Sequence, residues 1–89
     1  MAQRTVELVN RLGLHARAAA KLVHVTSSFT AHIAVRHDDE EVNGKSILGL
    51  LLLAAPCGTA LTITADGVDE TEALDAVEAL VRDRFGEPE

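Results

Sequence analysis

Aromatic side chains are almost absent from this sequence, because Phe29 and Phe85 are the only rings among 89 residues. Any core must therefore be packed from aliphatic side chains, which the hydrophobic content of 47% can supply. The single cysteine, Cys57, excludes an intramolecular disulfide and fits a reducing compartment. No apolar run approaches membrane-spanning length, and none follows a basic start. We therefore expect one small, soluble, cytoplasmic domain over residues 1–89.

Basic residues are scarce and unevenly distributed. Residues 1–36 carry a net charge of +4 and residues 37–89 one of −10, so the whole chain carries −6. The acidic remainder argues against nucleic acid, which requires a basic face. Arg17 and Lys21 lie in the positive part, where the local field should favour anionic groups and acidic partners.

Hydrophobic periodicity and turn residues predict the element order βαββαβα. Because strands and helices each have one apolar side, we expect an α+β two-layer sandwich, with a four-stranded sheet open to water on one face and three helices on the other. The expected elements are a strand at 3–9, a helix at 15–27, strands at 31–37 and 40–42, a helix from 46 to about 55, a strand at 59–65 and a final helix stopped by Gly86.

The final helix and the tail carry three local expectations. Asp69 and Glu72 have the spacing of a capping box at the start of the helix. The residues after Gly86, at 87–89, are expected to be loose. On the first helix, Lys21 falls outside the apolar stripe and is expected to face solvent.

Gly13-Leu14-His15-Ala16-Arg17 is the segment with the clearest chemistry. A glycine turn followed by strong helix formers places His15 at or beside a helix N-cap. Free backbone N–H groups and the helix dipole can bind a phosphate or carboxylate there, and the same field favours a neutral imidazole. A neutral imidazole beside the Arg17 guanidinium is suited to accepting a phosphoryl group. A surface histidine that merely caps a helix would fit these residues equally well.

Asn43-Gly44 predicts a turn, after which Ser46 caps the second helix. The leucine run that follows cannot all face the core, because consecutive helical residues point around the whole circumference. If Leu50 and Leu53 point inward, Ile47, Leu48 and Leu51 remain at the surface. A contiguous apolar patch on a small domain indicates a partner site, although scattered exposed leucines are common.

No metal or cofactor is predicted. His24 lies more than two helical turns from His15, so the two cannot hold one small ligand. The acidic run at residues 38–41 alternates faces and is interpreted as a solvated hairpin end.

Two motifs at this separation, residues 13–17 and Asn43-Gly44-Lys45-Ser46-Ile47-Leu48-Gly49, resemble HPr, the family of histidine-containing phosphocarrier proteins of the bacterial phosphoenolpyruvate-dependent phosphotransferase system. The resemblance spans nearly the whole chain, including Gly67-Val68-Asp69-Glu70. It implies an antiparallel sheet ordered 1-4-2-3. It also implies that His15 accepts phosphate on its δ nitrogen from phosphorylated enzyme I, with Arg17 stabilising the phosphate, and passes it to enzyme II A components.

The same resemblance implies a docking surface and a regulatory site. The docking surface comprises Ala20, Lys21, Ile47, Leu48 and Leu51. Ser46 would be phosphorylated by an ATP-dependent HPr kinase/phosphorylase. One residue departs from the family pattern, since Ala18 stands where proline is usual. Alanine loses the preset φ of proline but is the best helix former, so we expect the helix to form with a slightly looser start.

The sequence therefore predicts a monomeric phosphoryl carrier rather than a self-contained enzyme. The candidate nucleophile is expected to be exposed, no carboxylate lies near it in the sequence, and the chain is too short for a substrate pocket of its own. Two alternatives remain open: a nitrogen-branch paralogue with the same histidine, and a regulatory interaction module that uses the apolar patch without chemistry.

Overall fold

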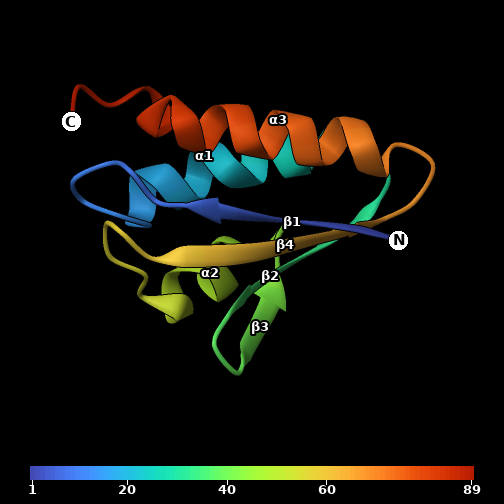
Figure 1. The fold of residues 1–89 in the computed structure, drawn as a ribbon, viewed down its shortest axis with the longest axis horizontal. Helices are drawn as coiled ribbons and strands as arrows, with labels where there is room; N and C mark the ends of the chain where they lie inside the picture. Colours follow the sequence, from blue (N-terminus) through green and yellow to red (C-terminus); the bar gives the residue numbers. More distant parts are fainter.

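The computed structural model describes residues 1–89 and has the predicted order of strands and helices (Figure 1). The elements are β1 (Ala2–Glu7), α1 (Ala16–Thr26), β2 (His32–His37), β3 (Glu40–Asn43), α2 (Ile47–Leu53), β4 (Ala60–Asp66), α3 (Glu70–Arg82) and a short 3₁₀ turn (Arg84–Gly86). The last helix ends at Arg82, earlier than expected, and the 3₁₀ turn follows it. No helix has the length and apolar character needed to cross a bilayer.

The sheet has four antiparallel strands in the order β1-β4-β2-β3, which confirms the order implied by the resemblance. Apolar residues of neighbouring strands stand opposite one another on the face that meets the helices. Leu61 of β4 pairs with Val6 of β1, and Ile63 pairs with Val35 of β2. All four side chains are buried, whereas the alternating Thr62 is only half-buried. Period-two alternation therefore sets which face of the sheet forms the core.

The helices form the second layer, and α1 packs against both α2 and α3. Figure 1 shows α1 and α3 side by side along the sheet. Each helix contributes buried residues to one aliphatic cluster, with Leu22 from α1, Leu50 from α2 and Val77 from α3. Phe85 is fully buried in the same cluster, so one of the two rings closes the core beyond the end of α3.

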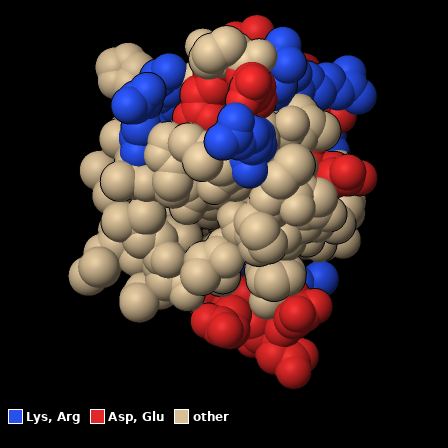
Figure 2. Space-filling model, turned by 90° about the vertical axis from the view of Figure 1, so that its left-hand side faces the viewer, with Lys and Arg blue, Asp and Glu red and all other residues tan.

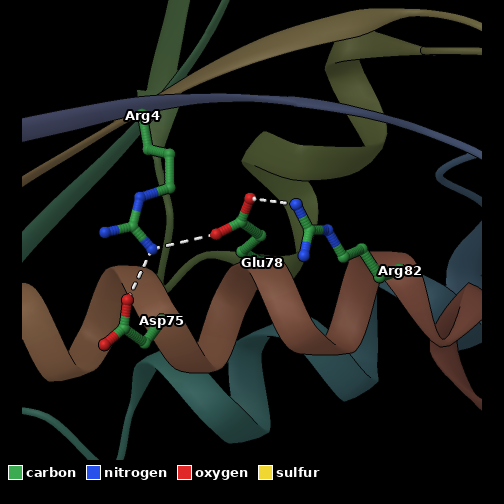
Figure 3. A network of polar contacts seen from close by, with 4 residues as sticks. All are labelled: Arg4, Asp75, Glu78 and Arg82. Carbon is green, nitrogen blue, oxygen red and sulfur yellow. Dashed lines mark hydrogen bonds and ion pairs between the residues drawn. The ribbon is translucent and has the colours of Figure 1, made fainter.

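An ion-pair network links the edge strand β1 to α3 (Figure 3). Arg4 lies opposite Ile63, on the helix-facing side of the sheet. Its guanidinium donates hydrogen bonds to Asp75 at 2.6 Å and to Glu78 at 3.0 Å, and Glu78 also pairs with Arg82 at 3.1 Å. A charged side chain is tolerated at this edge because both acidic partners come from the exposed rim of α3.

The predicted capping box at the start of α3 is wrong. Asp69 is the N-cap residue, but its side chain makes no cap hydrogen bond, and Glu72 is exposed. The Asp69 carboxylate instead accepts hydrogen bonds from the backbone N–H groups of Thr30 and Ala31, each at 2.8 Å. These two N–H groups lie just before β2, and they bind the carboxylate in place of the N–H groups of the first turn of α3. The hydrogen bond from Thr30, followed by that from Ala31, outweighs the effect of desolvation and lowers the pKa of Asp69.

The tail after α3 is not loose, contrary to expectation. The Glu89 carbonyl accepts a hydrogen bond from the Arg11 backbone N–H at 2.9 Å. The Lys21 ammonium donates to the Phe85 carbonyl at 2.5 Å, so Lys21 is half-buried and not fully hydrated. A turn with positive φ at Phe85 directs its ring into the core and returns the chain towards α1. As a result, the C-terminus and the loop before α1 lie at the same end of the molecule (Figure 1).

Candidate functional site

His15 is the N-cap residue of α1, as the sequence predicted. Its backbone is extended, with φ −87° and ψ 179°, and its carbonyl accepts the first helical hydrogen bond from Ala19 N–H at 2.8 Å. The His15 side chain makes no cap hydrogen bond, and no acidic residue lies in the first turn. The backbone N–H groups of residues 16–18 therefore have no intrahelical acceptor and can receive an anion. The helix is continuous although Ala18 replaces the usual proline.

A glycine turn fixes the position of His15. Gly13 has φ +67°, and a Cβ built there would lie 2.4 Å from the carbonyl oxygen of Ala55. That carbonyl accepts a hydrogen bond from Leu14 N–H at 2.9 Å, and the Leu14 side chain is buried. Leu14 therefore anchors this loop to the core, whereas the neighbouring Leu12 is exposed. The contact ties the end of α2 to the loop that carries His15.

A carboxylate lies against the imidazole, which sequence reasoning missed. Glu87 Oε2 contacts His15 Nε2 directly, and the Glu87 side chain is only 7% exposed against 26% for His15. Glu87 Oε1 accepts a hydrogen bond from Asn10 Nδ2 at 3.0 Å, and the same Asn10 amide donates to the Gly13 carbonyl at 2.7 Å. No local signal could have identified this cluster, because Glu87 is 72 positions from His15.

The charges around Glu87 keep its carboxylate ionised. Burial raises the pKa of Glu87, but hydrogen bonds from Asn10 and His15 and the positive charges of His15 and Arg17 outweigh this effect, so the net pKa lies below the ordinary value. Arg17 is exposed beside this group. A shallow pocket of about 240 Å³ is lined here by Arg11, Leu12, Arg17, Glu87, Pro88 and Glu89.

The second helix presents apolar side chains to solvent, largely in the predicted phase. Leu50 and Leu53 are buried, and Ile47 and Leu48 are exposed by 42% and 69%. Leu51 differs from expectation, because it is half-buried and packs against the core. The helix packs against both α1 and β3, so a position that helix phase alone leaves at the surface is partly covered.

Leu52 is a second surface residue that the sequence analysis missed, with 67% exposure. We call Ile47, Leu48 and Leu52 the α2 patch. Figure 2 views the end of the molecule that carries the C-terminus and the loop before α1. Charged side chains of both signs gather along the upper edge of this face, above a broad area without charge. The charged group and the uncharged area therefore form one continuous face.

Ser46 caps α2 as predicted. Its backbone is extended, and its hydroxyl oxygen accepts a hydrogen bond from Gly49 N–H at 3.0 Å. On α1, Ala20 is exposed, whereas Lys21 is committed to the Phe85 carbonyl. His24 is exposed, and no three His, Cys, Asp or Glu side chains gather closely enough to hold a metal ion.

Comparisons with known proteins agree over the full length of the chain. A family model described as the PTS HPr component phosphorylation site matches residues 2–83. The chain is 45% identical over 89 residues to the phosphocarrier protein HPr of Cupriavidus necator, with 100% of each chain covered. It is 42% identical over 85 residues to the phosphocarrier protein NPr of Shewanella violacea, covering 96% of this chain and 93% of the relative.

The fold comparison gives the same result. The crystal structure of HPr-C-His from Thermoanaerobacter tengcongensis superposes with a TM-score of 0.96 at 40% identity, covering 100% of both chains. Together with the family model and the full-length relatives, this similarity shows that the chain belongs to the HPr family of phosphocarrier proteins of the phosphotransferase system.

Proposed function

We propose that His15 accepts the phosphoryl group in this chain and that the chain carries it from phosphorylated enzyme I to enzyme II A components. The position of His15 is the observation that carries the proposal. A partly exposed imidazole stands at the start of α1, where the N–H groups of residues 16–18 are free to bind phosphate oxygens. A partner can therefore bring its phosphate to the ring without any opening of the domain.

Arg17 is proposed to stabilise the phosphoryl group during transfer. Its side chain is exposed on the first turn of α1, next to the carboxylate that contacts His15. A guanidinium there can hold two phosphate oxygens at once as charge develops on them. The helix N-terminus supplies the remaining stabilisation, because its dipole favours an anion.

The α2 patch is proposed as the centre of the partner interface. Ile47 and Leu48 expose apolar surface on the same short helix, and Ala20 and Lys21, which we include in the interface, lie on α1, which packs against α2. The exposed Arg17 beside His15 and the apolar patch on α2 suit a partner that brings an anionic phosphoryl group and an apolar contact. We propose that the carrier acts as a monomer in the cytoplasm.

The direct experiment is incubation with enzyme I and radiolabelled phosphoenolpyruvate, followed by acid and alkali treatment. A phosphoramidate on His15 should be lost in acid and retained in alkali. His15→Ala is the matched control and should incorporate no label, and persistent label in that variant would refute the assignment. The similarity to an NPr protein favours a second candidate, a carrier of the nitrogen branch. Parallel incubation with the enzyme I of each branch distinguishes the two by rate.

Ser46 is proposed as a second, regulatory phosphorylation site for an ATP-dependent kinase. A phosphate at this N-cap would lie at the positive end of α2, where it is compatible with the fold. It would also add about −1.5 to −2 charges beside Ile47 and Leu48, which opposes their burial against a partner.

Two substitutions separate the charge of Ser46 from its capping role. Ser46→Asp and Ser46→Asn both preserve an N-cap acceptor, but only the first adds charge. Ser46→Asp should slow phosphorylation of His15 by enzyme I, while Ser46→Asn should transfer at nearly the original rate. Equal rates in the two variants would leave Ser46 as a cap only.

A further inference from the structure

The contact between Glu87 and His15 has a chemical consequence, because the two nitrogens of an imidazole are not equivalent. A carboxylate can only accept hydrogen bonds, so the ring nitrogen that faces it must carry the proton. The nitrogen that faces Glu87 is Nε2. In the neutral ring, the proton is therefore on Nε2 and the lone pair is on Nδ1.

Asn10 fixes the orientation of the carboxylate. Its amide NH₂ group donates to both Glu87 Oε1 and the Gly13 carbonyl, at 3.0 and 2.7 Å. The reverse orientation of this amide would place its oxygen against two acceptor oxygens. The residue is completely buried, and its own oxygen has no hydrogen-bond partner. The fold thus leaves one buried acceptor unsatisfied while both donors of the amide are used to hold the site.

The tail itself is anchored on both sides of Glu87. On one side, Phe85 is buried and its carbonyl accepts a hydrogen bond from Lys21. On the other, Glu89 pairs with Arg11 through both its side chain, at 2.6 Å, and its backbone carbonyl. Glu87 therefore approaches the imidazole from a fixed segment with little side-chain freedom left to lose, as expected of a group that orients another.

We infer that Glu87 is a positioning residue for phosphoryl transfer: held by Asn10, it keeps the proton of His15 on Nε2 and presents the lone pair of Nδ1 to the incoming phosphoryl group. This inference rests on the proposed role of His15 as the acceptor. When the phosphorylated donor arrives, the Nδ1 lone pair forms the new bond to phosphorus. The bond from phosphorus to the donor breaks, and its electron pair leaves with the donor. The ring retains its Nε2 proton and becomes cationic, and the adjacent carboxylate balances that charge.

The test uses the complete chain and begins with the unphosphorylated protein. Two-bond ¹H–¹⁵N correlation spectra report which nitrogen of a neutral imidazole is protonated. They would be recorded under alkaline conditions, near pH 9, where the ring is neutral. The original chain should show His15 protonated on Nε2. Glu87→Ala should show a mixture of both tautomers. Glu72→Ala is the matched control, because it removes an exposed carboxylate in the first turn of α3 that takes no part in holding the tail or His15.

Glu87→Gln gives the sharpest outcome. Asn10 still presents its NH₂ group, so the new amide must direct its oxygen to Asn10 and its own NH₂ to His15. That arrangement should place the proton on Nδ1, the reverse of the original chain. Phosphorylation by enzyme I should then slow by about 10- to 100-fold, by analogy with the loss of the outer hydrogen-bond partner of a metal-binding histidine. Glu72→Ala should remain within about twofold of the original rate.

The outcomes separate this inference from the proposed function. If Glu87→Gln keeps the proton on Nε2, or transfers at the original rate, the inference is overturned even though His15 is labelled normally. If the tautomer reverses as expected but His15 of the original chain takes no label, the proposed function fails instead. A thermal melt of each variant is the folding check, and Glu87→Gln preserves the size of the side chain.

Discussion

Replacing Gly13 with alanine should weaken both the fold and the site, by an amount that the structure allows to be estimated. Gly13 has φ +67°, a conformation that costs an L-residue about 1–2 kcal/mol. Its new Cβ would lie 2.4 Å from the Ala55 carbonyl oxygen and 2.8 Å from two backbone atoms of Pro56. To relieve this clash, the carbonyl must leave the Leu14 N–H. A buried donor left without an acceptor costs about 1–3 kcal/mol.

The expected loss for Gly13→Ala is therefore about 2–5 kcal/mol, a large part of the roughly 4–13 kcal/mol usual for a domain of this length. Gly58→Ala is the matched control. Gly58 also has positive φ, +90°, but a Cβ there would have no neighbour within 4 Å. Its loss should be about 1 kcal/mol, because only the conformational term applies and the stiffer unfolded chain offsets part of it.

Urea unfolding followed by circular dichroism measures both variants. If the two alanine variants unfold at the same urea concentration, the close approach of Gly13 to residues 55–56 contributes nothing and the reasoning is refuted. Because the displaced loop carries His15, Gly13→Ala should also slow phosphorylation of His15 in the absence of urea. Gly58→Ala should not.

Three further predictions concern single side chains. Arg17→Ala should slow phosphotransfer about tenfold or more with almost no change in melting temperature, since the side chain is exposed, and a large stability loss with normal kinetics would contradict the role. Leu48→Asp should weaken enzyme I binding about 30-fold, the size of a hot-spot loss, and still melt cooperatively, whereas Leu50→Asp should unfold the domain because Leu50 is fully buried. Asp69→Asn should destabilise the fold at pH 7 and progressively less as the pH falls below about 3.9. The folded-state pKa of Asp69 is lowered, so its contribution is present above the unfolded pKa of about 3.9 and is lost as the pH falls through the folded pKa. A stability difference between variant and original chain that stays constant from pH 7 to pH 3 would show that the Asp69 charge is not involved.

Local patterns predicted the elements and the position of the functional histidine. Alternation in residues 59–65 identified the buried side of β4, and helix formers after Gly13 located His15 at an N-cap. The Ser46 cap followed from the same kind of signal, because the capping hydroxyl and the N–H that donates to it are separated by only three residues. The order of strands was not contained in any such pattern and came from the resemblance to a family.

The contacts that could not be predicted are those between distant segments. Asp69 had a local partner available at capping-box spacing, but the free amides of Thr30 and Ala31 lie closer in the folded chain. Glu87 reaches His15 across 72 positions, and nothing in the sequence around either residue reveals it. The partial burial of Leu51 could not be predicted for the same reason. Helix phase alone does not show which other elements pack beside α2.

The tail is attached at Phe85 and at Glu89, and these attachments predict how often Glu87 separates from His15. The Arg11 backbone N–H is bonded to the Glu89 carbonyl, whereas the Leu14 N–H is bonded to Ala55 in the loop after α2. Detaching residues 87–89 would expose the Arg11 amide to solvent while Phe85 keeps the core closed, because none of these three residues is fully buried. Hydrogen exchange at Arg11 should therefore be faster than at Leu14 and should report the frequency with which Glu87 leaves the imidazole. The carrier would then alternate between a histidine held in one orientation and a free one, on a timescale independent of global unfolding.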